Sequence, residues 1–354
     1  MKILVVNAGS SSLKCWYHDL SGDALDSPPA QPLWSEHVDW NEKTDIDATF
    51  ASVLQSLPGP VDVAGHRIVH GGKFRGATIL TPEVRAAIAE ETAIAPAHNR
   101  IALKAVDTLQ RHFGNELKQV AIFDTGFHAT LPPEAYIYPG PYAWFESGIR
   151  RYGFHGISHG YAARRAAQLL GGDSASLRLI TCHLGSGASL AAVRGGKSID
   201  TTMGFTPLEG LMMGSRSGSI DPGVLVYLLR ENNYTADQLE EILYKQSGLQ
   251  GVSGISSDMR EILAAIDRGD PRAQLAFDIY AHRLVREIGS MLAVLGGADA
   301  LVFTGGVGEN CAPLRDRAAE QFKFLPNLKV LVIHAEEEWE IACQCLELQT
   351  AVPT

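Results

Sequence analysis

The sequence predicts an α/β protein built from two duplicated halves. Three short apolar segments each run directly into a loop rich in glycine and polar residues, which is typical of a buried strand followed by a tight turn. The segments are residues 3–6, 179–182 and 300–304, and their loops are residues 7–12, 183–189 and 305–310. Gly9 and Ser10 of the first loop match Gly185 and Ser186 of the second, which indicates the duplication.

Amphipathic stretches predict helices between these strands. Apolar residues recur at spacings of three and four in residues 82–94, 100–113, 160–170 and 271–295. Strands that alternate with helices favour an α/β sheet over an all-α or all-β fold. The boundary between the halves is less marked in the sequence, and we place it around residues 147–152.

The composition limits the partners and the compartment. The chain has 354 residues, 45% of them hydrophobic, and a net charge of −10, which argues against nucleic acid or an anionic membrane as a partner. Its five cysteines are odd in number and lack the C-x-x-C spacing of a zinc or redox site, so we expect reduced thiols in the cytoplasm. We see no targeting segment or membrane-spanning stretch.

The first loop carries groups suited to phosphate. Residues 7–14 offer backbone N–H groups, three hydroxyls and Lys14, and glycine lets the backbone approach a ligand closely. A plain hairpin turn is the alternative.

Arg67 and Arg216 each lie among glycines or other small residues. The planar guanidinium can bind a carboxylate or phosphate through two hydrogen bonds, although a solvated surface ion pair is the alternative for either residue.

Asp124 follows the apolar segment 120–123, where open α/β sheets present ligand-binding groups. A helix N-cap is the alternative for this carboxylate. His155 lies between glycines and is suited to donate a hydrogen bond to a group in transfer, with a packed histidine as the alternative. His155 and His159 are four residues apart but lack the glutamate of an H-E-x-x-H zinc site, so we reject a zinc site there.

Taken together, the motifs resemble those of acetate kinases. The resemblance covers almost the whole chain in order, through residues 5–14, 66–72, 123–132, 151–159, 182–189, 204–222, 254–260 and 303–310. That family belongs to the superfamily of actin, hexokinase and Hsp70, so the resemblance implies two ribonuclease-H-like domains with a nucleotide cleft between them. We expect residues 1–149 to form the first domain, joined by residues 338–354, and residues 150–337 to form the second.

The resemblance also implies roles for individual residues. Asp124 matches the active-site aspartate, Arg67 and Arg216 would clamp the carboxylate and the phosphoryl group, and His155 would stabilise the transition state with Arg216. Asn7 and Glu337 would hold Mg²⁺, with Mn²⁺ as a substitute. ATP or ADP would be bound by Ser10, Ser12, Lys14, His183, Leu184, Gly185, Ser186, Gly187, Asp258, Met259, Arg260, Gly306, Val307, Gly308, Glu309 and Asn310.

The implied acyl pocket consists of Val69, Ala97, His98, Phe154 and Pro207. Ala97 stands where the family usually has leucine, so we expect propionate to be accepted better than in a typical member. Ser186 replaces an asparagine of the family pattern, and Ser219 replaces an aspartate. The chain is also short before its last strand, so the implied metal ligand is one of Glu336, Glu337 and Glu338, with Glu337 the match.

The resulting hypothesis is reversible, Mg²⁺-dependent transfer of the γ-phosphate of ATP to acetate. A carboxylate is already ionised at neutral pH, so positive charge and positioning matter more than a base, and we expect direct transfer without a phosphoenzyme. Alternatives are a kinase for propionate or butyrate, and a nucleotide-binding scaffold without catalysis. The resemblance implies a homodimer.

Overall fold

The computed structural model describes residues 1–9, 12–22, 24, 27–40, 44–90, 96–171 and 174–350, without the side chains of residues 96–98. The chain divides into two compact units. The first comprises Met1–Ala129 and the segment from Glu336 onward, and the second comprises Thr130–Ala335. This division falls before the expected boundary at 149, because residues 130–151 bond within the second unit: Thr130 donates to the Ser198 carbonyl and Arg151 pairs with Glu209.

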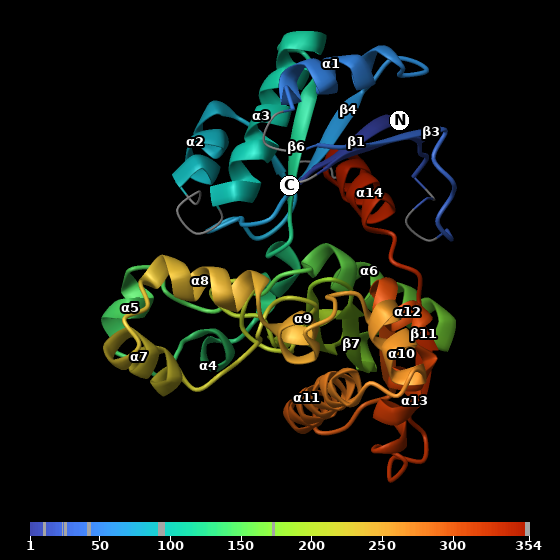
Figure 1. Cartoon of the computed structure of the whole chain (residues 1–354). Helices are drawn as coiled ribbons and strands as arrows, with labels where there is room; N and C mark the ends of the chain where they lie inside the picture. Colours follow the sequence, from blue (N-terminus) through green and yellow to red (C-terminus); the bar gives the residue numbers. More distant parts are fainter. Residues whose placement is uncertain are drawn as a thin grey trace. The chain divides into compact units, whose positions relative to one another are not determined.

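The first unit is built on a six-stranded sheet with the order β3-β2-β1-β4-β6-β5 (Figure 1). Strand β1 is antiparallel to β2 and parallel to β4, and β4 is parallel to β6. Its strands are β1 (Lys2–Ala8), β2 (Ser12–Asp19), β3 (Trp34–Asp39), β4 (Val63–Ile68), β5 (Thr78–Ile79) and β6 (Lys118–Phe123).

Helices cover both faces of this sheet. Leu4 and Val6 pack on one face against Phe50 of α1 (Ile46–Gln55) and Leu109 of α3 (Pro96–Phe113), with α2 (Pro82–Glu90) beside α3. Helix α14 (Glu337–Thr350) contacts β1 and β4, so the first strand and the last described helix lie side by side (Figure 1). Glycine is needed at position 65 of β4, because a Cβ there would lie 2.6 Å from Cys345 Sγ of α14.

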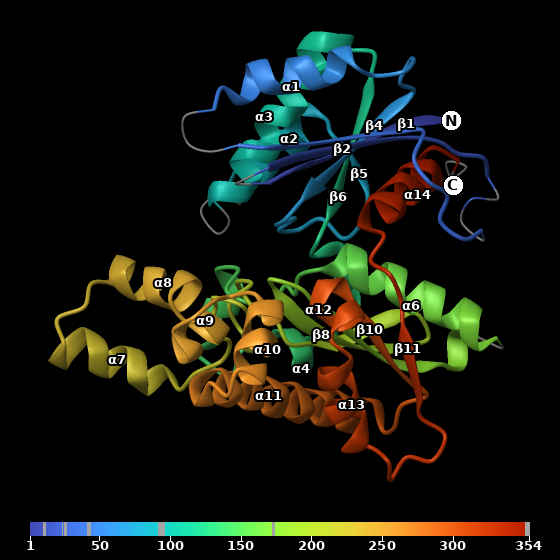
Figure 2. The ribbon, with the colours of Figure 1, turned by 45° about the vertical axis from the view of Figure 1, so that its right-hand side comes forward.

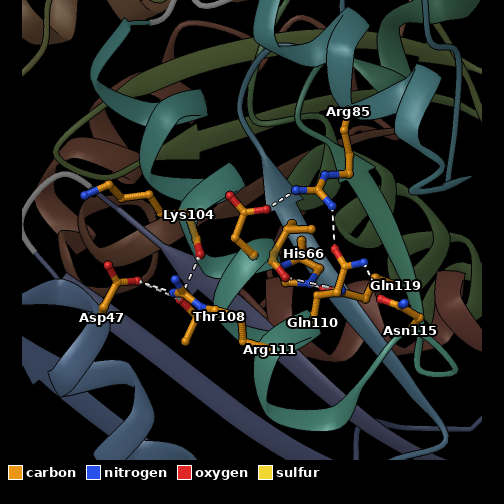
Figure 3. Close-up of polar contacts among 11 residues, drawn as sticks. Asp47, His66, Arg85, Lys104, Thr108, Gln110, Arg111, Asn115 and Gln119 are labelled. Carbon is orange, nitrogen blue, oxygen red and sulfur yellow. Dashed lines mark hydrogen bonds and ion pairs between the residues drawn. The ribbon is translucent and has the colours of Figure 1, made fainter.

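Polar side chains tie α3 to its neighbours in the first unit (Figure 3). Asp47 of α1 accepts hydrogen bonds from Thr108 at 2.8 Å and from Arg111 at 2.7 Å. These bonds satisfy polar groups that would otherwise be costly next to the core. The remaining contacts of the cluster are Arg85 with Gln110 and Asp107, His66 with Gln119, Gln119 with the Val106 carbonyl, and Thr108 with the Lys104 carbonyl.

The second unit repeats the strand pattern in a sheet of order β11-β10-β7-β8-β9. Strands β7, β8 and β9 are antiparallel neighbours, and β10 and β11 run parallel to β7, just as β4 and β6 run parallel to β1. The predicted α/β class and the duplication are therefore confirmed. These strands are β7 (Arg178–Leu184), β8 (Ala188–Arg194), β9 (Lys197–Thr201), β10 (Ala300–Thr304) and β11 (Lys329–Val332).

Helices α6 (Gly156–Leu170) and α11 (Pro271–Leu295) lie on opposite faces of the second sheet (Figure 2). The apolar stripe of α11 is buried against β7, β8 and β9, so it serves the core of this unit. The other helices are α4 (Pro133–Tyr136), α5 (Tyr142–Glu146), α7 (Pro222–Glu231), α8 (Ala236–Lys245), α9 (Gly248–Ser253), α10 (Met259–Asp267), α12 (Gly305–Asn310) and α13 (Ala312–Glu320), with 3₁₀ turns at Gly126–Thr130 and Ser174–Ser176.

Within the described ranges, no helix is long and apolar enough to cross a membrane. All five cysteines are buried free thiols, as their number and spacing predicted.

Candidate active site

Two neighbouring parallel strands of the first unit bring Arg67 and Asp124 together. Arg67 is the penultimate residue of β4, and Asp124 directly follows β6. The guanidinium donates from Nη2 to Asp124 Oδ2 at 2.7 Å and from Nε to Oδ1 at 3.0 Å. Arg67 Nη1 also lies 3.3 Å from Oε2 of Glu337, the first residue of α14.

The electrostatics of this group follow from its burial. Burial raises the pKa of the Asp124 carboxyl above its ordinary value; the Arg67 charge opposes this shift and Glu337 adds to it. Burial by itself would lower the pKa of Arg67, but Asp124 and Glu337 together raise it, so the guanidinium stays charged. A positive group is thereby held between two carboxylates.

The strand register places further polar residues on the same face. Val5 of β1 pairs with Gly65 of β4, so Asn7, two residues after Val5, lies on the same face as Arg67, two residues after Gly65. Arg67 pairs with Ile122 of β6, so Asp124, two residues after Ile122, lies on this face as well. Lys14 shares this face because it pairs with Asn7 across the β1–β2 hairpin, and Ser12 follows by alternation. Ser10 lies outside the described residues.

The oxygen donors on this face suit a hard divalent cation that keeps several of its waters. They are the amide of Asn7 and the carboxylates of Asp124 and Glu337. Among the described residues, no cluster of three or more histidines, cysteines and acids has the geometry of a closed metal site. Of the three candidate glutamates, Glu337 contacts Arg67, whereas the pKa of Glu338 is raised to about 7 by its burial, with Glu336 and Glu337 adding to the shift.

In the second unit, His155 and Arg216 approach a common space beside the second loop. His155 has a φ of +56° at the N-cap of α6, an uncommon conformation for a residue with a side chain. A Cβ built on Gly187 would lie 3.1 Å from His155 Nε2 and 3.6 Å from Arg216 Nη1. Because Gly187 has no side chain, an imidazole nitrogen and a guanidinium nitrogen can face a ligand there.

The surroundings hold both side chains in place. The ring of His155 stacks on His183 at 4.3 Å, and its Nδ1 lies 2.9 Å from Ser189 Oγ. Arg216 donates from Nη1 to the Pro207 carbonyl at 3.0 Å, and burial lowers its pKa below the ordinary value. No described carboxylate pairs with Arg216, which leaves its charge available to an anion.

A pocket of about 690 Å³ opens beside the same loop. Asp258 caps α10 within its lining by accepting from the Arg260 N–H at 2.8 Å. The predicted nucleotide residues that line the pocket are Gly185, Ser186, Asp258, Met259, Arg260, Gly306, Val307 and Asn310.

Gly308 and Glu309 do not line this pocket. Glu309 instead accepts hydrogen bonds from the backbone N–H groups of Gly305 and Ala335, both at 2.9 Å, which ties α12 to the segment after β11. Sequence reasoning missed Ser257, Leu263 and Cys311, which do line it. Leu263 could have been predicted from the sequence, because it lies one helical turn after Met259 on α10 and therefore on the same face of that helix.

The predicted acyl-pocket residues belong to both units. Phe154 is fully buried next to His155 in the second unit, where Pro207 contacts Arg216 through its carbonyl. Val69 follows β4 in the first unit, and the side chains of Ala97 and His98 lie outside the described residues. Leu184 ends β7 and is buried.

Comparisons with known proteins agree on one family. The sequence model of the Acetokinase family matches residues 2–330. An acetate kinase from Gloeobacter violaceus is 50% identical, with 98% of each chain covered. One from Nostoc punctiforme is 48% identical, covering 98% of this chain and 99% of the relative.

Solved structures give the same result. The acetate kinase of Porphyromonas gingivalis has a TM-score of 0.89 at 35% identity, with 99% of this chain and 100% of that chain covered. A propionate kinase from Francisella tularensis has a TM-score of 0.87 at 33% identity, covering 97% and 98%. A hexokinase from Thermus thermophilus, at 14% identity and a TM-score of 0.51 over 99% and 100%, shares the fold alone. The chain belongs to the Acetokinase family.

Proposed function

We propose that this protein is an acetate kinase that transfers the γ-phosphate of ATP to acetate and releases acetyl phosphate and ADP. The observation that carries this function is the approach of His155 Nε2 and Arg216 Nη1 to the space above Gly187. Two donors that face one small space suit the equatorial oxygens of a phosphoryl group in transfer. The pocket beside this loop, at about 690 Å³, has room for a nucleoside.

The reaction needs no general base. A carboxylate oxygen of acetate attacks the γ-phosphorus while the bond to the bridging oxygen of ADP breaks, so no proton has to move. Arg67 orients the acetate carboxylate, and Asp124 holds Arg67 through their paired hydrogen bonds. We infer direct, in-line transfer, which inverts a chiral γ-phosphate; net retention would contradict it.

Asn7 and Glu337 are the proposed Mg²⁺ ligands, with Asp124 close to the same site and Mn²⁺ able to substitute. The metal would neutralise charge on the nucleotide phosphates. Ser10, Ser12, Lys14 and residues 183–187 are proposed to contact those phosphates. Adenosine is proposed to bind the pocket-lining residues Asp258, Met259, Arg260, Gly306, Val307 and Asn310.

Trapping of acetyl phosphate as its hydroxamate tests the function. We expect product from ATP, Mg²⁺ and acetate with the wild-type chain, and a fall of roughly 10²-fold to 10³-fold in kcat for Arg216→Ala, because one transition-state donor is lost. Arg194→Ala is the matched control, since that arginine also donates to backbone carbonyls of the second unit but lies away from Gly187. Nucleotide binding without product would favour a non-catalytic scaffold.

We further propose a cytoplasmic homodimer that uses helix α7. This helix buries none of its residues and exposes Val224, Val226, Tyr227 and Leu229, an apolar surface that a second copy would cover. Light scattering should give a dimer for the wild type and a monomer for the double variant Val226→Glu, Leu229→Glu. Leu275→Glu, at an exposed position of α11, should remain dimeric. A monomeric wild type would contradict the dimer, and cell fractionation tests the compartment.

A further inference from the structure

A chain of hydrogen bonds runs from the buried sheet of the second unit to His155. His155 Nδ1 lies 2.9 Å from Ser189 Oγ, and the same oxygen lies 2.8 Å from His159 Nε2. His159 Nδ1 lies 2.8 Å from Thr181 Oγ1. Ser189, His159 and Thr181 are fully buried, so water does not compete for these bonds.

The chain couples the protonation of the two histidine rings. A serine hydroxyl has one hydrogen, so Ser189 can donate to only one of the imidazoles, and the other must donate to Ser189. A hydrogen on Nδ1 of one ring is thus linked to a definite tautomer of the other. The direction of the whole chain is decided at its buried end.

Thr181 sets this direction. Its hydroxyl lies 2.8 Å from His159 Nδ1 but 3.4 Å from the Ala191 carbonyl, a distance at which a hydroxyl bond is weak. Donation of the Thr181 hydroxyl hydrogen to His159 Nδ1 therefore gives stronger hydrogen bonds than its donation to the Ala191 carbonyl. His159 then carries its hydrogen on Nε2 and donates to Ser189, and Ser189 donates to His155 Nδ1.

We propose that Thr181, His159 and Ser189 are positioning residues that hold His155 as the neutral tautomer with its hydrogen on Nε2. That atom borders the space above Gly187, so the tautomer presents an N–H donor there without requiring a protonated ring. The role of this donor in catalysis rests on the proposed phosphoryl transfer. The tautomer itself is a property of the protein alone and can be measured without any reaction.

Nitrogen NMR of the full chain labelled with ¹⁵N-histidine tests the tautomer. At a pH of about 8, above the usual histidine pKa of about 6.5, we expect a protonated Nε2 and an unprotonated Nδ1 for His155. The signals of His155 are assigned as those that disappear in His155→Asn. His159 should show the same pattern. Protonated Nδ1 on a neutral His155, or a doubly protonated ring, would overturn the proposal even if the enzyme is fully active.

Thr181→Val tests the direction of the chain. Without the hydroxyl, His159 Nδ1 loses the donor that Thr181 supplied. His155 should then populate both tautomers, and kcat should fall by about twofold to tenfold, in proportion to the lost Nε2–H fraction. The KM values for ATP and acetate should change little. Thr181→Ser restores the hydroxyl and should restore both the spectrum and kcat.

Thr304→Val provides the matched control. Thr304 is a buried threonine on the adjacent strand β10, and its hydroxyl has no hydrogen-bond partner among the described residues. The same chemical change there should leave the His155 spectrum unaltered. A wild-type spectrum in Thr181→Val, or a loss of kcat with an unchanged tautomer, would reduce Thr181 to a packing role and overturn the proposal.

Discussion

Arg67 and Asp124 are joined by a two-point ion pair, with Nη2 at 2.7 Å from Oδ2 and Nε at 3.0 Å from Oδ1. The pair links the ends of two parallel strands, and the Asp124 side chain is almost fully buried. The arginine proposed to orient acetate is therefore held by a carboxylate of the protein before any substrate binds. Its geometry is set in advance, which lowers the entropic cost of positioning the substrate.

Replacement of Arg67 should affect both stability and catalysis. Arg67→Ala leaves the buried Asp124 without its counter-charge, so we expect a loss of about 3 kcal/mol in the free energy of unfolding. The acetate kcat/KM should fall by roughly 10²-fold or more, since the acetate carboxylate loses the positive charge that orients it. Urea unfolding and the hydroxamate assay measure the two effects.

Arg85→Ala is the control for this prediction. Arg85 also donates to side chains in the first unit, to Gln110 and Asp107, but these bonds lie within the cluster around α3 (Figure 3). We expect a loss of about 1 kcal/mol and an almost unchanged kcat/KM. Equal losses of activity in Arg67→Ala and Arg85→Ala would mean that Arg67 acts only through stability.

A methyl group at position 187 should block the space between His155 and Arg216. The added Cβ would lie 3.1 Å from His155 Nε2, tighter than an ordinary contact. We expect Gly187→Ala to lower kcat by about 10²-fold while far-UV circular dichroism and the melting temperature stay close to the wild type. Gly289→Ala, where a methyl meets no atom within 4 Å, is the control. Full activity of Gly187→Ala would place phosphoryl transfer elsewhere.

Ala97 provides a prediction about the acyl group that comes from the sequence alone. Where the family usually has leucine, alanine leaves room for an additional methylene, which is worth about 1 to 3 kcal/mol in such a pocket. Ala97→Leu should therefore raise the ratio of kcat/KM for acetate over propionate by at least about fivefold. A strong preference for acetate that Ala97→Leu leaves unchanged would reject this explanation.

His18 should make the first unit sensitive to mild acid. Burial lowers the pKa of His18 from its ordinary 6.5 to about 4, and its ring packs edge-on against Trp339 at 5.7 Å. Between these pH values the unfolded chain binds a proton that the folded chain does not, so stability falls as the pH falls. His18 should account for about 2 kcal/mol of the loss between about pH 7 and about pH 5.

His18→Phe removes the titrating group and keeps a ring of similar size. The difference in unfolding free energy between the two pH values should shrink by about 2 kcal/mol in urea titrations. The buried Nε2 of His18 has no hydrogen-bond partner within the described residues, so the variant should not lose stability at neutral pH. The same pH dependence in variant and wild type would show that His18 is exposed to water in solution.

Much of the fold was predictable because its signals are local. An apolar strand followed by small and polar residues can be recognised in a few consecutive residues, and three such segments led to the duplicated α/β halves. Helix limits were less accurate. The segment 160–170 belongs to a helix that begins at Gly156, because His155 adopts a left-handed conformation that allows an earlier start than the glycines indicated.

Contacts between residues far apart in the sequence could not be predicted from such local patterns. The contact between Glu337 and Arg67 depends on how α14 meets β4, and no spacing along the chain encodes it. Glu309 of α12 accepts hydrogen bonds from the backbone N–H groups of Gly305 and Ala335, a contact that depends on how α12 meets the segment after β11.

The sequence by itself determined the chemistry of this protein: which arginines, acids, histidines and glycines follow its strands, and the family that these motifs indicate. Only the tertiary structure decided which of these groups meet. Strand register brought Asn7, Arg67 and Asp124 to one face, and the packing of α6 on β7 and β8 joined Thr181, His159 and Ser189 beneath His155. The physical reason is that a hydrogen bond depends on distances of a few tenths of an ångström, which packing fixes and residue order does not.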